Sequence, residues 1–229
     1  MVAGRWDGRW ITGASTALPH SSAWDLPRRY LWQAPRARAL CLLRDSDAAL
    51  ADFVRDKAVA LVGNAGSLLN GKLGGQIEAE DLVIRLNRGF VVDPEAQGSR
   101  TDAVSITPEL SEAEIIERFS PQRLLFLTHR LRHYRIFKPE NVRRTLFYKS
   151  RYWRADRRKI GRRPSSGYMM LSWLLRVGTA KSITLYGFDF GATRTYYNPS
   201  DYRTPHDFEA EREIILDWEA KNLVRIVRS

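Results

Sequence analysis

Cysteine is nearly absent from this chain. Cys41 is the only one among 229 residues, so no disulfide can form within the chain, and this composition suits a reducing compartment. Cys41 lies in the apolar run Ala39–Leu43, which indicates a buried filler rather than a nucleophile. The sequence also lacks the ~18 apolar residues of a membrane span, and residues 1–7 lack the apolar core of a signal peptide. We therefore expect a cytoplasmic protein that touches the inner membrane only peripherally.

Metal-binding motifs are scarce as well. Asp45-Ser46-Asp47 has the form of an Asp-x-Asp site, but it precedes the first predicted strand. His129 and His133 stand four residues apart without a third ligand, which makes a weak metal site and leaves them as candidates for acceptor contact. We expect no metal and no cofactor.

Negative charge is in the minority, since 37 Lys and Arg residues face 26 Asp and Glu residues, a net charge of +11. Such an excess favours an anionic partner: a nucleotide, nucleic acid, an acidic glycan or an anionic membrane surface. Much of it lies in residues 143–163, where Tyr148, Tyr152 and Trp153 are interleaved with basic residues. This pattern is typical either of a solvated loop or of a surface that stacks single-stranded nucleic acid. We expect a mobile segment that closes over ligand, because it leads directly into Pro164–Gly167.

The apolar run Val59–Val62 predicts a fully buried central strand, and Gly63-Asn64-Ala65-Gly66 a sharp turn into a helix. In an open α/β sheet, ligands bind beyond the carboxyl ends of the strands. Gly63 and Gly66 allow close approach of the backbone to a ligand, and the helix start offers unpaired N–H groups to an anion. Asn64 then lies on the rim of a phosphate or sugar site. The alternative is a turn that only connects a strand to a helix.

Strands and helices alternate along the chain. Further strands are predicted at 81–87, 101–106, 123–127, 144–147 and 182–186, and helices at 36–56, 109–119, 167–177 and 204–221. This alternation predicts an α/β fold: a single Rossmann-like domain with a mainly parallel twisted sheet and helices on both faces. Residues 51–229 form that domain, and residues 1–50 form an N-terminal extension with a helix that packs on the core.

The last predicted helix has the clearest start signal. Thr204 can cap it, Pro205 fits its first position, and Thr204 with Asp207 resembles a capping box. His206 then lies in the first turn, where the helix dipole favours the neutral imidazole that a general base requires. An exposed histidine without a role is the alternative. Glu211 lies about 140° round the helix from His206 and is predicted to anchor the helix instead.

Five short motifs, in the same order, resemble those of family 29 glycosyltransferases, the eukaryotic-type sialyltransferases. They are Val59–Arg88 for the large sialylmotif, Gly98–Thr101 for the turn after it, Pro164–Phe188 for the small sialylmotif, Tyr196–Pro199 for the aromatic third motif and His206–Glu211 for the very small motif. The resemblance covers residue 59 to the C-terminus. It implies a GT-A-variant fold and inverting, metal-independent transfer of a sialic acid or related nonulosonate from its CMP conjugate to a sugar hydroxyl.

The resemblance also implies residue roles. Asn64 and Asn87, with Gly63 beside them, hold the phosphate and ribose region, and His206 is the general base that takes the acceptor proton. The remaining substrate-binding residues are Ser165, Ser166, Gly167, Phe188 and Tyr197, which line the donor pocket. Each has an ordinary alternative: capping serines, core aromatic residues or turn-forming asparagines.

Three departures from the family pattern stand out. Val59 and Ala180 replace a cysteine pair of Golgi members, and their transmembrane anchor is missing. Both fit a cytosolic, bacterial-type version. Thr195 replaces a histidine that contacts the donor phosphate, so Arg194, Arg162 or Arg163 is a candidate to stabilise the leaving group.

The expected partners are a CMP-activated nonulosonate donor and a glycan or glycolipid acceptor at an anionic membrane surface. Nucleic acid is less favoured as a partner. Two alternatives remain open. One is a CMP-Kdo-dependent transferase, and the other is a non-catalytic basic nucleotide- or nucleic-acid-binding protein on the same fold.

Overall fold

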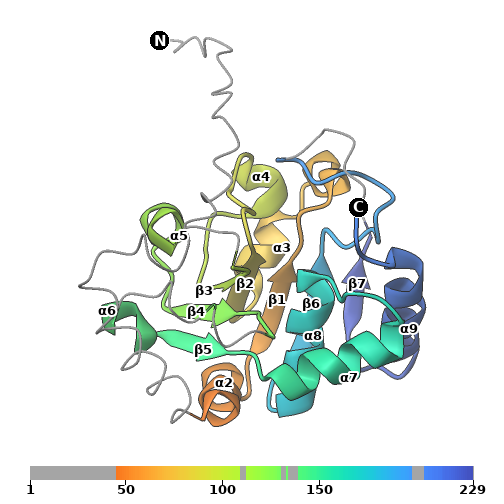
Figure 1. The fold of residues 1–229 in the computed structure, drawn as a ribbon. Coiled ribbons are helices and arrows are strands. Elements are labelled where there is room, and N and C mark those ends of the chain that lie inside the picture. The colour runs from red at the N-terminus through yellow and green to blue at the C-terminus, as the bar shows by residue number, and fades with distance from the viewer. Residues whose placement is uncertain (1–44, 109–111, 130–132, 134–138, 198–203, 229) are drawn as a thin grey trace.

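The protein is built around one seven-stranded parallel sheet with the strand order β5-β4-β3-β2-β1-β6-β7 (Figure 1). This computed structural model describes residues 45–108, 112–129, 133, 139–197 and 204–228. The strands are β1 (Ala58–Val62), β2 (Leu82–Leu86), β3 (Ala103–Ile106), β4 (Arg123–Phe126), β5 (Thr145–Phe147), β6 (Ser182–Tyr186) and β7 (Arg225–Val227). The first six were predicted from the sequence, and β7 was not.

Helices connect the strands and cover both faces of the sheet (Figure 1). They are α2 (Ser46–Val54), the 3-10 helix η1 (Gly66–Asn70), α3 (Gly74–Ala79), α4 (Pro94–Gln97), α5 (Glu112–Phe119), α6 (Pro139–Val142), α7 (Ser150–Ile160), α8 (Ser166–Val177) and α9 (Phe208–Ala220). The predicted α/β class with a parallel sheet is therefore confirmed. Among the helices of the described residues, none is long and apolar enough to cross a bilayer.

Strand β1 lies inside the sheet, between β2 and β6. The chain builds outward from it through β2 to β5, and then returns to place β6 on its other side. Val59 pairs with Leu82 of β2 and with Ile183 of β6. The strand order thus reverses between β1 and β6, and at such a point the carboxyl ends of the strands leave a crevice for a ligand.

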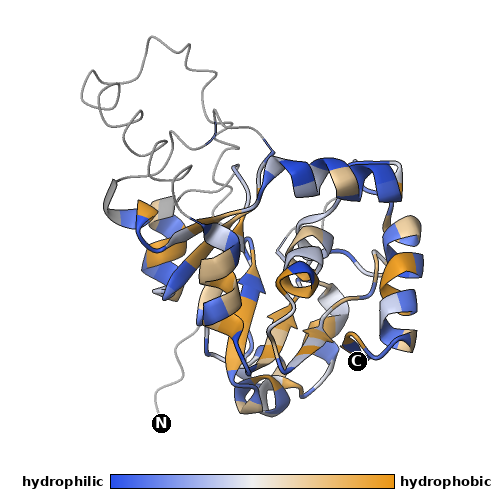
Figure 2. Cartoon of the chain, turned by 90° about the horizontal axis from the view of Figure 1, so that it is seen from below, coloured by the Kyte–Doolittle hydropathy of each residue, from blue (hydrophilic) through white to orange (hydrophobic). Residues whose placement is uncertain are grey.

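Both faces of β1 are buried. Leu61 packs in a core cluster that includes Leu50 of α2 and Trp173 of α8. Val62 points to the other face and packs with Ile77 of α3. Hydrophobic residues accordingly concentrate on the strands between the helices (Figure 2). Burial on both faces explains why this strand is a continuous apolar run rather than an alternating pattern.

The N-terminal prediction needs a correction. The helix expected over residues 36–56 does not pass through Asp45, because the Asp45 side chain accepts hydrogen bonds from the amides of Asp47 and Ala48 and caps α2. The proposed boundary at residue 50 falls inside α2. Residues 1–44, with Cys41, lie outside the described part, so the division of the chain stays a prediction.

The basic segment is also not the loop that was expected. Residues 150–160 form α7, and its Asp156 side chain is only 1% exposed. Asp156 accepts hydrogen bonds from the Tyr148 hydroxyl, from Ser172 Oγ at 3.0 Å and from Arg176 Nη2 at 2.7 Å. A buried carboxylate with three donors holds the helix against the core. Closure over a ligand stays a prediction, and it now concerns a helix.

Candidate active site

A cavity of about 460 Å³ opens where the strand order reverses. It is lined by the turn after β1, by Asn87 after β2, by the start of α8, by the loop after β6 and by the segment before α9. All nine residues assigned from the sequence line it: Gly63, Asn64, Asn87, Ser165, Ser166, Gly167, Phe188, Tyr197 and His206. The structure thus brings together residues up to 143 positions apart in the chain (206 − 63). Their individual roles stay predictions.

The two glycines of the β1 turn pack against protein. A Cβ on Gly63 would lie 2.4 Å from the Gly187 carbonyl oxygen, and one on Gly66 would lie 3.0 Å from the Arg194 carbonyl oxygen. Glycine is therefore needed so that the chain segments after β1 and β6 can touch. Gly63 also lines the cavity, and close approach of a ligand to the two glycines stays a prediction beside this packing role.

The amides at the start of η1 are already used. Gly66 N–H donates to the Arg194 carbonyl at 2.8 Å, and Ser67 N–H donates to Thr193 Oγ1 at 3.1 Å. Leu68 N–H donates to the Ala65 carbonyl at 3.1 Å. The prediction of an anion site on free amides at this helix start is wrong, because the loop after β6 takes two of these donors.

Two residues that line the cavity, Asn64 and Asn87, each have a buried amide oxygen without a partner among the residues that the structure describes. Asn64 Nδ2 donates to the Leu86 carbonyl at 2.9 Å, which turns Asn64 Oδ1 away from that carbonyl. Asn64 Oδ1 and Asn87 Oδ1 are both buried and have no hydrogen-bond partner within the described residues. Asn87 has φ of +50°, a backbone conformation that asparagine tolerates better than most residues. Buried oxygens without donors are costly, so both are suited to accept hydrogen bonds from a ligand.

The start of α8 offers donors to the same cavity. Ser165 caps the helix, and its side chain accepts from the Tyr168 amide at 3.1 Å. The first two helical amides, Ser166 and Gly167, have no hydrogen-bond acceptor in the described part of the chain, as expected for the first turn. With the positive end of the helix dipole they form a site suited to an anion. This helix start, rather than that of η1, is the candidate phosphate site.

Glu211 fixes this helix start to α9. Its carboxylate accepts from Ser165 N–H and from Ser165 Oγ, both at 2.6 Å. The side chain is 3% exposed, and burial raises the pKa of the Glu211 carboxyl to about 7. The sequence predicted that Glu211 anchors the last helix. The structure shows that Glu211 anchors α9 to the cap of α8.

His206 lies one residue before the helix cap and not in the first turn. Asp207 caps α9 by accepting from the Ala210 amide at 3.1 Å, while Thr204 Oγ1 accepts from the His206 amide at 3.2 Å. The predicted capping box of Thr204 with Asp207 is therefore wrong. Because His206 lies outside the first turn, the helix dipole does not explain a neutral imidazole at this position.

The tautomer of His206 has a different origin. His206 Nδ1 lies 2.9 Å from the Arg163 carbonyl oxygen. A carbonyl can only accept, so Nδ1 must carry the hydrogen. In the neutral ring the lone pair is then on Nε2, which is the arrangement that a general base needs.

The aromatic residues have both predicted and ordinary roles. Phe188 packs against the hydrophobic core and against Gly167, where a Cβ would lie 2.9 Å from Phe188 Cε1. The same ring lines the cavity. The Tyr197 side chain is 40% exposed, its hydroxyl lies 3.5 Å from Asn64 Nδ2, and burial raises its pKa.

Of the three arginines considered for the leaving group, only Arg194 lines the cavity. It is the one Lys or Arg among the described residues that do so. Asp189 organises the loop that carries it by accepting from Gly191 N–H at 3.1 Å, from Thr193 N–H at 2.9 Å and from Ser67 Oγ at 3.0 Å. The sequence analysis missed Asp189. Its position shortly after β6 was the available signal.

His129 and His133 are not part of this site. His129 stacks on Trp153 with ring centroids 3.9 Å apart, and His133 Nδ1 lies 2.7 Å from Thr128 Oγ1. Neither lines the cavity, and contact of this pair with the acceptor stays a prediction. Within the described residues no group of three or more His, Cys, Asp or Glu side chains could hold a metal ion.

Comparison with known proteins adds a partial family match and a fold. Residues 51–127 match the model of glycosyltransferase family 29 (sialyltransferase). The comparison with curated proteins finds no match.

Three solved structures resemble the whole fold. A mammalian sialyltransferase in complex with Gal-beta-1-3GalNAc-ortho-nitrophenol has a TM-score of 0.57 and 18% identity, covering 89% of this chain and 87% of that one. A variant of the sialyltransferase CST-II in complex with CMP has a TM-score of 0.52 and 15% identity, and the match covers 74% of this chain and 80% of that one. The monofunctional alpha-2,3-sialyltransferase Cst-I from Campylobacter jejuni has a TM-score of 0.51 and 17% identity, and the match covers 73% of this chain and 74% of that one. The fold is therefore that of the sialyltransferases.

Proposed function

We infer that this chain, with a family 29 match over residues 51–127 and the fold of the sialyltransferases, is a CMP-sugar-dependent glycosyltransferase. It transfers sialic acid or a related nonulosonate from the CMP conjugate to a hydroxyl of an acceptor glycan or glycolipid. The observation that carries the proposal is the meeting, in one cavity, of two partnerless amide oxygens, an open helix start and a histidine held in one tautomer. The scarcity of cysteine suits a cytoplasmic enzyme.

Donor binding follows from the polar groups of the cavity. Asn64 Oδ1 and Asn87 Oδ1 accept from hydroxyl groups of the ribose and its surroundings. The Ser166 and Gly167 amides donate to the phosphate, and Arg194 supplies the positive charge that the replaced histidine provides elsewhere in the family. Phe188 and Tyr197 form walls of the donor pocket.

The chemistry needs one base and one stabilised leaving group. The acceptor hydroxyl attacks the anomeric carbon while His206 Nε2 takes its proton. The bond from the anomeric carbon to the phosphate oxygen breaks, and its electrons remain on CMP. Attack from the face opposite the leaving group inverts the anomeric configuration.

No divalent cation is required in this scheme. CMP carries a single phosphate, so there is no diphosphate for a cation to clamp. Backbone amides at a helix start and one guanidinium can stabilise the departing phosphate.

Thermal unfolding with nucleotides tests the proposal. We expect CMP to raise the melting temperature, AMP to raise it much less, and EDTA to leave the CMP effect unchanged. Equal shifts with CMP and AMP would favour a general nucleotide-binding protein on the same fold. Loss of the CMP effect on chelation would contradict the metal-free scheme. CMP-sialic acid and CMP-Kdo share the leaving group, so mass spectrometry of the transferred sugar identifies the donor.

A further inference from the structure

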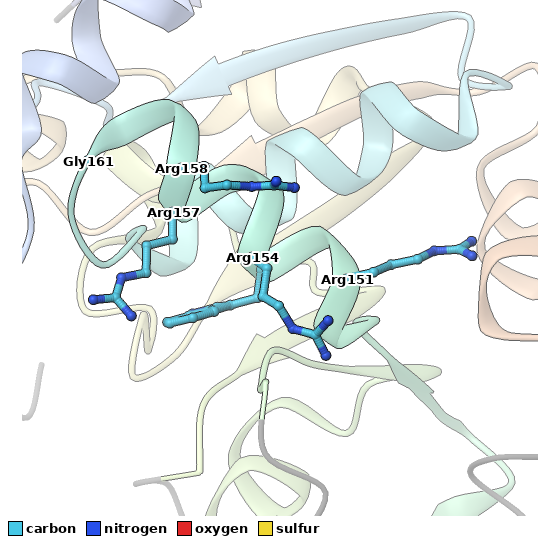
Figure 3. A pocket seen from close by; sticks show the side chains of 6 residues that line it. Arg151, Arg154, Arg157, Arg158 and Gly161 are labelled. Atoms are coloured by element: carbon cyan, nitrogen blue, oxygen red, sulfur yellow. The ribbon is translucent and has the colours of Figure 1, made fainter.

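A second hollow lies along the exposed side of α7. Its volume is about 660 Å³, and it is lined by Arg151, Trp153, Arg154, Arg157, Arg158 and Gly161 (Figure 3). It shares no lining residue with the candidate active site. Four guanidinium groups and no carboxylate among the lining residues make a concentrated positive surface.

The helical repeat explains this concentration. Arg151, Arg154 and Arg158 follow a spacing of three and four residues, which places them on one face of α7. Asp156 and Ile160 are buried on the other face. The buried side of α7 therefore packs on the core, and the exposed side carries the positive charge.

These arginines are largely available to a ligand. Arg154 and Arg158 form no ion pair with any carboxylate of the described residues, and both are exposed. The Arg157 guanidinium lies 5.4 Å from the centroid of the Trp153 ring. His129 stacks on the same ring, so Trp153 forms a fixed apolar wall among the charges.

The shape of the hollow indicates the kind of ligand. The side chains of Arg151 and Arg157 point away from each other along the helix rather than toward one point (Figure 3). Such a spread fits several anionic groups along a chain better than one phosphate. Guanidinium groups bind carboxylate, phosphate and sulfate well. A flat lipid surface would not fill a hollow.

The hollow lies close to His206. Gly161 lines it, and the carbonyl of Arg163, two residues on, holds His206 Nδ1. Two residues span at most ~7 Å. We propose that the α7 hollow binds the anionic part of the acceptor, a glycan chain with carboxylate, phosphate or sulfate groups whose reacting hydroxyl reaches His206. This proposal rests on the proposed function and adds the class of its acceptor.

Binding of a model polyanion tests the proposal. The probe is labelled dextran sulfate of about ten sugars, with uncharged dextran of equal length as its control. We expect the protein to bind dextran sulfate and not dextran. Arg154→Gln/Arg158→Gln should weaken that binding roughly tenfold, because each exposed ion pair contributes a factor of a few. The matched variant Lys181→Gln/Arg225→Gln removes two exposed charges elsewhere and should change it less than twofold.

Transfer assays then connect the hollow to the acceptor. The α7 variant should raise KM for acid-bearing acceptors roughly tenfold, with KM for neutral acceptors and kcat unchanged. The proposal is overturned if the α7 variant and the matched variant lose dextran sulfate binding equally. It is also overturned if KM for acid-bearing acceptors is unchanged in the α7 variant. So does a variant that binds dextran sulfate normally but no longer binds phosphatidylglycerol vesicles, since α7 would then dock on lipid. CMP stabilisation, measured on the same samples, reports separately on the donor site and thus on the proposed function.

Discussion

The active-site cavity and the α7 hollow are built in opposite ways. The cavity collects residues from five distant segments, and several are held by contacts between those segments, such as Ser165 by Glu211 or His206 by the Arg163 carbonyl. The α7 hollow comes from eleven consecutive residues, 151–161, and its cations extend into solvent. A preorganised site suits chemistry at one point, whereas a spread of exposed charge suits loose binding of a longer ligand.

Of all the variants, those at His206 should change activity the most. His206→Ala removes the proton acceptor and should lower kcat roughly 10²–10⁴-fold, the usual contribution of a positioned base. CMP affinity, measured by calorimetry, should change little because Asp207 still caps α9. His133→Ala, outside both the cavity and the α7 hollow, is the control and should keep near-normal turnover. If His206→Ala keeps normal turnover, the base lies elsewhere.

Removing the cavity's cation should come next. Arg194→Gln should lower kcat roughly 10²-fold, since one preorganised group is lost from the departing phosphate. Arg162→Gln, exposed and outside the cavity, should stay within twofold of the parent. Similar losses in both variants would show that net charge, and not position, matters.

Glu211 makes the cavity sensitive to pH. Because burial raises its pKa to about 7, the folded state prefers the protonated carboxyl. Its contribution to stability is present below pH ~4.5 and is lost as pH rises through the folded-state pKa of about 7, by about 3 kcal/mol in all. Urea unfolding at several pH values should show this fall in the parent and in exposed Glu213→Gln, but not in Glu211→Gln. The same slope in Glu211→Gln would assign the titration to another group.

Asn87 allows a smaller and cleaner test. Asn87→Gly keeps the positive φ but removes the partnerless oxygen, so CMP affinity should fall roughly tenfold. Asn222→Gly makes the same change at a residue with φ of +57°, away from the cavity. Its CMP affinity should equal that of the parent. Weaker binding in both variants would point to a backbone effect.

Much of the sheet could be predicted because its strands are buried on both faces, so the run at β1 is continuous and apolar and the run at β2 is interrupted only by Arg85. The edge strand β7 has only three residues, with exposed Arg225 at its start, and gave no such signal. Helix α7 was taken for a loop because charge dominates its sequence. Its buried Asp156 pairs with Arg176, twenty positions away, and no local pattern shows that contact.

The site residues were located through motifs, but their local geometry was not predictable. The pairing of the Gly66 and Ser67 amides depends on the loop after β6, more than a hundred residues later. The start of α9 was misplaced because Thr204-Pro205 and Asp207 are both good start signals. Only the observed Ala210 contact decides in favour of Asp207.

The Arg163 carbonyl has a consequence for how this chain can vary. A main-chain oxygen orients His206, so the identity of the side chain at position 163 is unconstrained by that contact. What is constrained is the number of residues between α7 and α8, since an insertion or deletion would displace the oxygen. Four residues, 161–164, separate Ile160 from the Ser165 cap. In designed or related versions of this enzyme, the number of residues in that connection should be constant while their identities vary.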